Sequence, residues 1–401
     1  MSDNDNYKNY IDHESCKNTE KYPIIFVLLY AFYFGANGIL NPYLPVYLED
    51  IGMNQTVKGI LLALGPFVAM FSQPFWGIIG DRAKTKNIIL KILFFSSAAI
   101  FILFPLNKEI WYTFLIYIIF MFFYSSINPT IDTITLEYLE RRKWKFGPIR
   151  MGGTIGYALI ALLSGFIIER NINYMFFMYS TILFISLFFI RNIPPVKGYQ
   201  FGKEKISPSK LIKNKKLIAL LGFGFAVQMT LGYYYSFYSI YFKQSGGDNS
   251  LLGWSMFLAG ISEIPFLLFA DKITKKMGII NTLIVSSLIT SLRWFFVYIS
   301  NSPKQLLLTS CLHGFTFIVF TYCLAVFINE NVPRELKASG QALNGLINMG
   351  AARIVGNILG GVLSDAFGIK QMFFYISIIA VIATGLFGFI LKKLESVENR
   401  T

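Results

Sequence analysis

The stretch GIIGDRAKTKN, residues 77–87, ends one apolar run and leads directly into the next. It places one acid and three basic residues in a short connection between runs that carry little charge. The flanking runs, 57–79 and 88–106, are about as long as a helix that crosses the ~30 Å hydrocarbon core of a bilayer. The stretch therefore predicts two membrane-spanning helices joined by a tight polar loop.

Apolar runs of this length recur from one end of the chain to the other. Of the 401 residues, 54% are hydrophobic and only 14% are charged, whereas roughly 25% are charged in a soluble domain. We therefore expect an all-α polytopic membrane protein, with Pro42 and Pro45 interrupting the first span and Pro129 the fourth. The twelve expected spans are 23–47, 57–79, 88–106, 111–138, 150–168, 174–191, 217–242, 251–270, 279–300, 305–328, 338–363 and 371–391.

The basic residues are concentrated in every second connection. The loops after spans 2, 4, 6, 8 and 10 hold most of them, which by the positive-inside rule places both termini in the cytoplasm. The same rule accounts for the formal net charge of +14 without a nucleic-acid partner. The expected parts are a cytoplasmic tail 1–22, a six-helix bundle 23–191, a basic cytoplasmic linker 192–216, a second six-helix bundle 217–391 and a cytoplasmic tail 392–401.

An acid recurs at the ends of spans 2, 5, 8 and 11. These acids are Asp81, Glu169, Asp271 and Asp365, which lie 88, 102 and 94 residues apart. A three-span unit repeated four times is the plan of transporters built from two bundles, each of which contains a 3+3 inverted repeat.

No other class of function has a recognisable signature in the sequence. The cysteines form no disulfide framework, and the sequence contains no metal-spaced His/Cys cluster, nucleotide-binding loop or nucleophile elbow. We expect no cleavable signal peptide, because the N-terminal segment is polar and rich in Asp and Glu. We therefore expect a monomer in a bilayer that is not an enzyme and needs no cofactor or metal.

Two resemblances refine this expectation. Residues 77–87 are similar to the loop of form G-x-x-x-D-R/K-x-G-R/K-R/K between spans 2 and 3 of the major facilitator superfamily, although Lys84 replaces the usual glycine. The resemblance implies the major facilitator fold, with twelve transmembrane helices in two six-helix bundles. Four segments also resemble the family of lactose permease and the oligosaccharide–proton symporters: 41–50 (NPYLPVYLED), 128–158, 290–294 (TSLRW) and 311–315 (CLHGF).

The closer resemblance implies roles for individual residues. In that family an acid of span 4 and an arginine of span 5 bind sugar hydroxyls, and the next aromatic stacks on the sugar ring. These roles fall on Asp132, Arg150 and Tyr157. The family's arginine and histidine of proton coupling fall on Arg293 and His313.

Three positions depart from the family pattern. The family's span 10 lysine and glutamate are replaced by Ser310 and Thr316, and its span 8 glutamate falls on Gly260. Glu263, one turn further along span 8, is an interior acid, and a buried carboxyl group is a candidate proton carrier. The alternative is that Glu263 only neutralises a nearby arginine. The expected proton-coupling residues are Glu263, Arg293, His313 and Arg353.

Polar residues also follow helical spacing on several spans. Arg150, Thr154 and Tyr157 share one face of span 5, and Asn128 shares a face of span 4 with Asp132. An acid and an arginine on adjacent helices form either a ligand clamp or a purely structural bridge, with Arg150 reaching to the interface. The polar and aromatic residues at helical spacing on spans 1 and 7 either line a cavity or form hydrogen bonds between helices. The expected substrate-binding residues are Asp132, Arg150, Tyr157, Asn128, Thr154, Asn37, Asn41, Gln228 and Tyr235.

The even-numbered loops supply a last group of candidates. An acid at a helix end that pairs with basic loop residues is expected to hold one state of the two rocking bundles closed. The alternative is a solvated loop that only sets the topology. The residues concerned are Gly77, Asp81, Arg82, Lys86 and Asp271.

Together these features predict a secondary active transporter of the bacterial inner membrane. We expect proton-coupled uptake of a small polar solute by alternating access, with a sugar or oligosaccharide as the first candidate. The alternatives are a permease for a nucleoside or an aromatic carboxylate, and an exporter. A transport-inactive sensor and a membrane enzyme are the other classes considered.

Overall fold

The computed structural model describes residues 23–140, 144–196, 214–333 and 336–398. Within these ranges, twelve helical segments are long and apolar enough to cross a membrane. The expected N-terminal tail lies outside the described residues, as do residues 197–213 of the linker and 399–401 of the C-terminal tail. The cytoplasmic placement of these parts stays a prediction.

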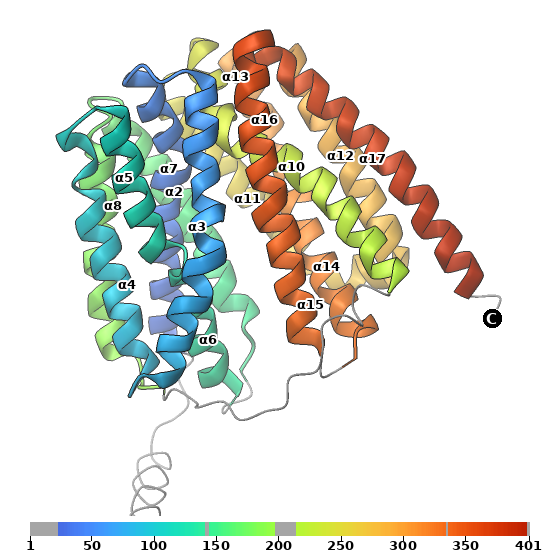
Figure 1. The fold of residues 1–401 in the computed structure, drawn as a ribbon, viewed down its shortest axis with the longest axis horizontal. Coiled ribbons are helices and arrows are strands. Elements are labelled where there is room, and N and C mark those ends of the chain that lie inside the picture. The colour runs from blue at the N-terminus through green and yellow to red at the C-terminus, as the bar shows by residue number, and fades with distance from the viewer. Residues whose placement is uncertain (1–22, 141–143, 197–213, 334–335, 399–401) are drawn as a thin grey trace, which may run out of the picture.

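The first six spans form one bundle, drawn blue to green in Figure 1. Its elements are α2 (Ile24–Asp50), α3 (Gln55–Arg82), α4 (Lys86–Phe101) with the 3-10 turn η1 (Phe104–Leu106), α5 (Ile110–Tyr124), α6 (Ile127–Glu140), α7 (Gly147–Ile168) and α8 (Tyr174–Asn192). Span 3 combines α4 with η1, and span 4 combines α5 with α6.

The second six spans form the other bundle, drawn yellow to red. Its elements are α10 (Lys215–Gln244), α11 (Asn249–Met277), α12 (Ile279–Ile299), α13 (Pro303–Thr309), the 3-10 segment η2 (Ser310–Phe315), α14 (Phe317–Asn331), α15 (Lys337–Asn344), the π-helical segment η4 (Gly345–Ala351), α16 (Ala352–Phe367) and α17 (Ile369–Glu398). Span 10 combines α13, η2 and α14, and α15, η4 and α16 form span 11.

The expected interruption of the first span is wrong. Helix α2 runs unbroken through Pro42 and Pro45, both of which are buried. A proline inside a helix gives up one backbone hydrogen bond, and neighbouring helices in a membrane bundle compensate for this loss. Tertiary packing therefore overrides the local signal.

Two other spans are broken. The expected break in span 4 is present, because α5 ends at Tyr124 and α6 begins at Ile127, two residues before Pro129. Span 10 breaks at η2, which contains His313 and which the sequence analysis did not predict. Backbone groups freed at such breaks must be satisfied by protein or by a water-filled cavity, so both breaks point toward the interior of the molecule.

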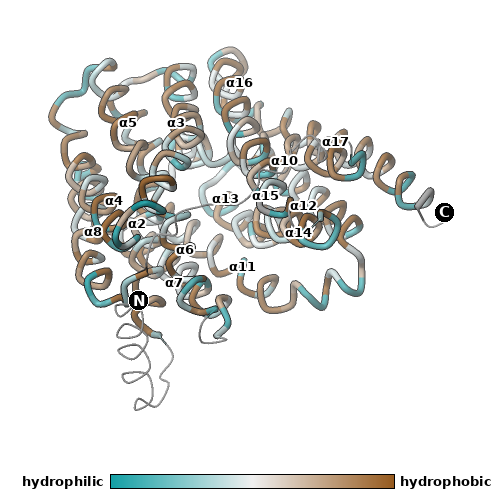
Figure 2. Tube along the Cα trace, turned by 60° about the horizontal axis from the view of Figure 1, so that its bottom comes forward, coloured by the Kyte–Doolittle hydropathy of each residue, from teal (hydrophilic) through white to brown (hydrophobic). Residues whose placement is uncertain are grey.

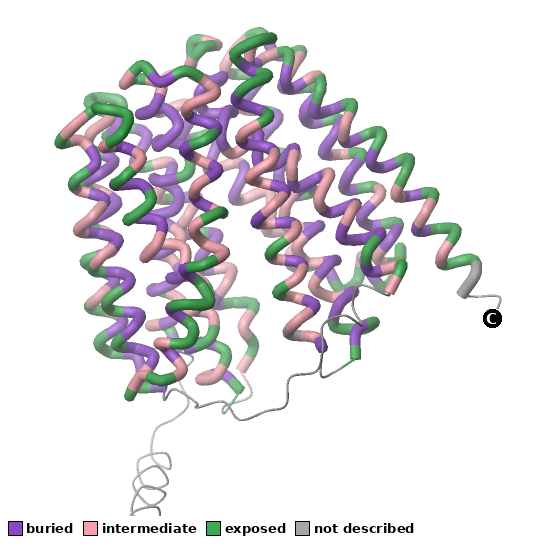
Figure 3. The backbone as a smooth tube through the Cα atoms, viewed as in Figure 1, coloured by how far each residue is buried: buried purple, intermediate pink, exposed green. Residues whose placement is uncertain are grey.

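The outer surface of the helices is apolar. Figure 2 shows hydrophobic residues along most of each helix and hydrophilic residues mainly at the helix ends. Figure 3 shows exposed residues recurring along the outer helices, α4, α8 and α17 among them. Many of these are large and hydrophobic, such as Phe71, Phe188 and Phe389 at 63%, 67% and 70% exposure. An exposed apolar surface of this extent is the lipid-facing surface of a membrane protein.

The two bundles touch at one end of the molecule and diverge toward the other (Figure 1). The main contacts between them are made by α7 with α11 and by α3 with α16. Glycines permit both contacts: a Cβ on Gly165 would lie 3.2 Å from the Cα of Gly253, and one on Gly59 would lie 3.1 Å from the Cα of Gly361. Small residues let helices approach closely in a membrane. The end where the bundles touch carries the α2–α3 connection (Figure 1), and we call it the closed end.

Candidate functional site

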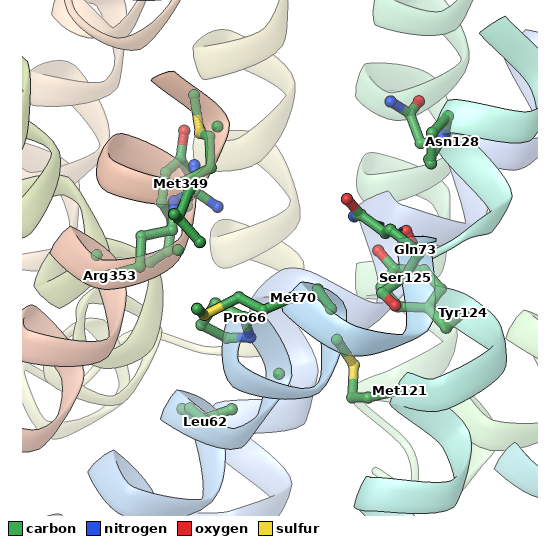
Figure 4. A pocket seen from close by; sticks show the side chains of 18 of the residues that line it. Leu62, Pro66, Met70, Gln73, Met121, Tyr124, Ser125, Asn128, Met349 and Arg353 are labelled. Carbon is green, nitrogen blue, oxygen red and sulfur yellow. Dashed lines mark hydrogen bonds between the residues drawn. The ribbon is translucent and has the colours of Figure 1, made fainter. Parts of the chain in front are cut away.

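A cavity of about 1110 Å³ lies between the two bundles. Its walls come from α2, α3, α5 and α6 of the first bundle and from α10, α15, η4 and α16 of the second. Figure 4 shows Arg353 on one side of the cavity and Gln73, Ser125 and Asn128 on the other. The lining includes Gln73 in the second half of α3 and Ser339 at the start of α15. The cavity therefore runs from the middle of the molecule toward the end opposite the closed end, which we call the open end.

A second pocket of about 230 Å³ adjoins this cavity, and Asn41, Tyr235 and Arg353 line both. Its walls come from both bundles and include the predicted residues of span 5 and of span 10. Nine of the predicted residues line it: Asn37, Asn41, Arg150, Thr154, Tyr157, Tyr235, Glu263, His313 and Arg353. The substrate-binding and proton-coupling predictions therefore meet in one small pocket.

Asp132 and Arg150 do not contact each other directly. Asp132 lines the large cavity and accepts hydrogen bonds from the Tyr30 hydroxyl at 2.5 Å and from Asn128 Nδ2 at 3.3 Å. The Arg150 guanidinium lies over the ring of Phe34, 4.0 Å from its centroid, and lines the small pocket. None of the ion pairs within the described ranges joins the two residues. The predicted clamp is therefore open, with an acid in one cavity and an arginine in the other.

Close packing of α7 on α2 turns the predicted face of span 5 toward the pocket. Gly156 lies against the backbone of Ala31 so closely that any Cβ would overlap it. Thr154 is buried and lines the pocket beside Tyr157. The Tyr157 hydroxyl points across to the second bundle, 3.8 Å from the Met256 sulfur. Tyr157 thus touches both bundles at the pocket.

The three predicted amides differ in position. Asn37 is buried and accepts a hydrogen bond from the Tyr124 hydroxyl at 2.8 Å. Asn41 lines both cavities. Gln228 lines neither, because it is fully buried within α10, and its Oε1 and Nε2 atoms have no hydrogen-bond partner among the described residues. The structure brings the two asparagines to the site and leaves Gln228 outside it.

Arg293 orients His313. Arg293 Nη1 lies 2.7 Å from His313 Nδ1, and Arg293 Nε donates to the Thr309 carbonyl at 3.1 Å. A guanidinium only donates, so Nδ1 accepts and the proton of the neutral imidazole is on Nε2. Nε2 lies 3.4 Å from the Tyr235 hydroxyl and 3.7 Å from Glu263 Oε1. His313 therefore presents an N–H group toward Glu263.

The break in span 10 brings His313 to Glu263. The N–H group of Gly314 donates to Ser262 Oγ at 2.8 Å, and any Cβ on Gly314 would overlap the Ser262 carbonyl oxygen. The Thr316 hydroxyl donates to the His313 carbonyl at 2.6 Å and so satisfies a backbone group in the break. Sequence reasoning missed this contact, although the glycine directly after the histidine is a signal for close backbone approach.

Arg353 lies between two aromatic rings. Its guanidinium carbon is 5.3 Å from the Tyr235 ring centroid and 5.6 Å from the Phe317 ring centroid. Its Nε atom is buried and has no hydrogen-bond partner in the part of the chain that the structure describes. No group of three His, Cys, Asp or Glu side chains able to hold a metal occurs among these described residues either.

The predicted loop residues of the first bundle lie outside both cavities. Asp81 Oδ1 is 3.7 Å from Lys86 Nζ, and Lys86 also forms an ion pair with Glu137 of α6. Gly77 and Arg82 are exposed. The ion pairs of Lys86 with Asp81 and with Glu137 thus stay within one bundle.

Asp271 has the same place in the second bundle. It is exposed near the end of α11 and accepts a hydrogen bond from the Tyr322 hydroxyl of α14. This contact also stays within its own bundle. The expected role of these residues in closing one state stays a prediction.

The other two acids of the repeat join the bundles at the closed end. Asp365 of α16 accepts hydrogen bonds from the N–H groups of Gln55 and Thr56, the first residues of α3, at 2.9 and 2.8 Å. Glu169, directly after α7, accepts one from the N–H group of Asn249, the first residue of α11, at 2.6 Å. The first N–H groups of a helix lack partners within the helix and carry partial positive charge. Each acid therefore caps a helix of the opposite bundle.

The chain is similar to known transporters over almost its whole length. Residues 24–375 match the model described as MFS_1 like family. The chain is 24% identical to the uncharacterized transporter YwbF of Bacillus subtilis, over 90% of this chain and 92% of the relative. It is 23% identical to the maltose permease of Geobacillus stearothermophilus, over 89% and 92%. The crystal structure of the nucleoside transporter NupG has the same fold, with a TM-score of 0.77, 20% identity and coverage of 91% and 97%.

Proposed function

The chain belongs to the MFS_1 like family of the major facilitator superfamily, and on this premise we propose that it takes up a small polar solute by proton-coupled secondary transport. It is a multi-pass protein of the bacterial inner membrane that carries small-molecule solutes. A sugar or oligosaccharide is the first candidate solute.

One observation carries the proposal. Arg150 and Tyr157 of the first bundle and Glu263, His313 and Arg353 of the second line the same small pocket. A solute in this pocket touches both bundles, so its binding energy changes when the bundles move relative to each other. Transporters of this plan place the solute at the bundle interface and expose it alternately to the two sides.

The open end faces the cytoplasm in this proposal. The excess of basic residues in the even-numbered connections supports this orientation, because the described helices that these connections join have the corresponding ends at the open end. The described state is then open to the inside. The bundles 23–191 and 217–391 rock about the pocket, and the linker 192–216 and both tails are cytoplasmic.

Glu263 is the proton carrier in this proposal. Its Oε1 atom lies 3.7 Å from His313 Nε2 and the side chain lines the pocket, where an entering solute changes its surroundings. His313 does not take up a second proton while Arg293 donates to its Nδ1 atom, because an imidazolium has no acceptor left. Arg293 and His313 therefore position the acid, and Glu263 holds or releases the proton.

The likeness to a maltose permease and the resemblance of residues 128–158 to oligosaccharide symporters support a sugar. Tyr157 offers a ring face for a sugar, and Asn37, Asn41 and Thr154 offer hydroxyl partners. The fold shared with a nucleoside transporter keeps a nucleoside as the second candidate.

Uptake into energised membrane vesicles tests the proposal. A labelled panel of sugars, oligosaccharides, nucleosides and aromatic carboxylates is offered with and without a protonophore. We expect at least one panel member to accumulate, and the protonophore to abolish its accumulation. Accumulation that is unchanged by the protonophore would exclude proton symport. Solute extrusion from preloaded vesicles would identify an exporter, and binding without transport would identify a sensor.

A further inference from the structure

Two arginines line the small pocket and form no close ion pair with a carboxylate among the described residues, although Arg150 lies within electrostatic range of Glu263 and Asp132. Arg150 and Arg353 both line it, and no ion pair within the described ranges includes either residue. Arg293, the third arginine of this region, differs because it is fully buried and donates to His313 and to a backbone carbonyl. Arg150 comes from α7 and Arg353 from α16, so the two cations belong to opposite bundles.

Aromatic rings support both guanidinium groups. Arg150 lies 4.0 Å from the centroid of Phe34, and Arg353 lies 5.3 and 5.6 Å from those of Tyr235 and Phe317. Cation–π contacts stabilise a desolvated cation in part. They use the face of the guanidinium and leave its N–H edge for an acceptor in the plane. A charge at membrane depth costs about 2.5–3.5 kcal/mol, so an unused edge calls for an anionic partner.

We propose that Arg150 and Arg353 together bind the carboxylate of an acidic solute, and that the solute class is a small hydroxylated monocarboxylate such as a sugar acid. This inference rests on the proposed transport function and specifies its substrate. The guanidinium fork matches the two oxygens of a carboxylate. The hydroxyl groups have partners in Asn37, Asn41 and Thr154 on the same walls.

The charges in the pocket favour a monoanion. Two guanidinium groups and the ionised Glu263 carboxylate leave one positive charge in the empty pocket. When a proton neutralises Glu263, a solute with a single carboxylate takes the place of that negative charge, so the net charge of the pocket is unchanged. The pocket volume of about 230 Å³ suits one compact ring, since it is below the ~300–1,000 Å³ typical of drug-sized ligands. A longer solute would extend past Asn41 and Tyr235 into the large cavity.

The same arrangement couples solute to proton. The solute carboxylate and Glu263 share one pocket and repel each other when both are charged. A proton on Glu263 removes this repulsion, so each ligand favours binding of the other, and the coupling is reciprocal. One carboxylate and one proton then enter together without a net change of charge.

Matched pairs of ligands test the anion site on the purified full-length protein in lipid nanodiscs. The probes are D-glucuronate against D-glucose and D-galacturonate against D-galactose, with thermal unfolding as the readout. We expect at least one acid to raise the melting temperature with an apparent Kd at least tenfold below that of its neutral partner. Arg353→Gln should abolish this preference, and Arg353→Lys should restore part of it. Arg191→Gln, at an exposed arginine of α8 outside both cavities, is the matched control and should retain the preference.

Each result decides the proposal. Equal stabilisation by the acid and the neutral sugar, no stabilisation by either acid, or an unchanged preference in Arg353→Gln would overturn it. Melting temperatures of the variants without ligand show whether they fold. Vesicle uptake separates the two proposals. If only a neutral sugar accumulates, and the protonophore prevents its accumulation, the anion site is wrong and proton-coupled transport stands. If an acid binds in a way that depends on Arg353 but does not accumulate in a protonophore-sensitive way, the anion site stands and proton coupling is wrong.

Discussion

The carboxylate of Asp365 accepts hydrogen bonds from both the backbone N–H group and the hydroxyl group of Thr56, at 2.8 and 2.5 Å. Asp365 lies near the end of α16 in the second bundle, and Thr56 is in the first turn of α3 in the first. Asp365 therefore ties the second bundle to the first at the closed end, as Glu169 does through α11, and any opening of that end must break these bonds.

Asp365→Ala should shift the molecule toward a state that is open at this end. A lost helix cap costs about 0.5–2 kcal/mol, which corresponds to an equilibrium shift of about 2- to 30-fold. Spin labels at Lys108 and Lys304, exposed residues of the two bundles near this end, measure the separation. We expect a population at longer distance to grow.

Glu140→Ala is the control for this experiment, because Glu140 is an exposed acid at the end of α6 and lies away from the closed end. Its distance distribution should match that of the wild type. Glu169→Ala removes the equivalent cap on α11 and should act like Asp365→Ala. An unchanged distribution in both cap variants would show that the caps do not hold the closed end.

The sequence predicted most of the fold because its main determinant is local. A membrane span needs about 20 consecutive apolar residues, so each span can be recognised from its own stretch of sequence. The acid repeat was equally visible, and it gave the correct helix ends for Glu169 and Asp365. Their partners on α11 and α3 could not be predicted, because those contacts join residues 80 and about 310 positions apart.

Nine of the predicted residues line the small pocket, but their arrangement could not be predicted. The resemblance to oligosaccharide symporters pointed to Arg150 and Tyr157, and helical spacing placed them on one face. The placement of Arg150 and Asp132 in different cavities depends on how α6 and α7 pack. Gln228 could not be placed from the sequence either, because helical spacing does not distinguish a polar residue that faces a cavity from one packed between helices. Helix α2 continues through Pro42 and Pro45, so the prolines alone do not break this tightly packed helix.

Gly314→Ala should separate His313 from Glu263. The new Cβ would overlap the Ser262 carbonyl oxygen, so η2 must move away from α11. Overpacking of this kind costs about 1–3 kcal/mol. We expect a lower melting temperature and loss of proton-driven accumulation.

Gly385→Ala is the matched control, because a Cβ there meets no atom within 4 Å. Its melting temperature and uptake should equal those of the wild type or exceed them slightly, since alanine favours the helix. Normal accumulation in Gly314→Ala would argue against a need for the His313–Glu263 contact.

Glu263→Gln should uncouple transport. Glutamine resembles the protonated acid in shape and cannot release a proton, so the solute can cross in both directions but cannot be concentrated. We expect exchange of labelled solute across the vesicle membrane to persist, with accumulation reduced to the protonophore-treated level. Glu330→Gln, at an exposed acid near the end of α14, should accumulate solute normally. Protonophore-sensitive accumulation by Glu263→Gln would assign the proton to another group.

Gln228→Met should leave transport intact and raise stability. Gln228 lines neither cavity, and both polar atoms of its buried side chain lack partners among the described residues. An unsatisfied buried polar group costs about 1–3 kcal/mol, and methionine fills a similar volume without that cost. The melting temperature should therefore rise while the uptake rate stays constant. Tyr235→Phe provides the contrast, because it removes the hydroxyl 3.4 Å from His313 Nε2 and should slow uptake severalfold at unchanged stability. If Gln228→Met slowed uptake as much as Tyr235→Phe does, Gln228 would have to reach the solute in another state of the transport cycle.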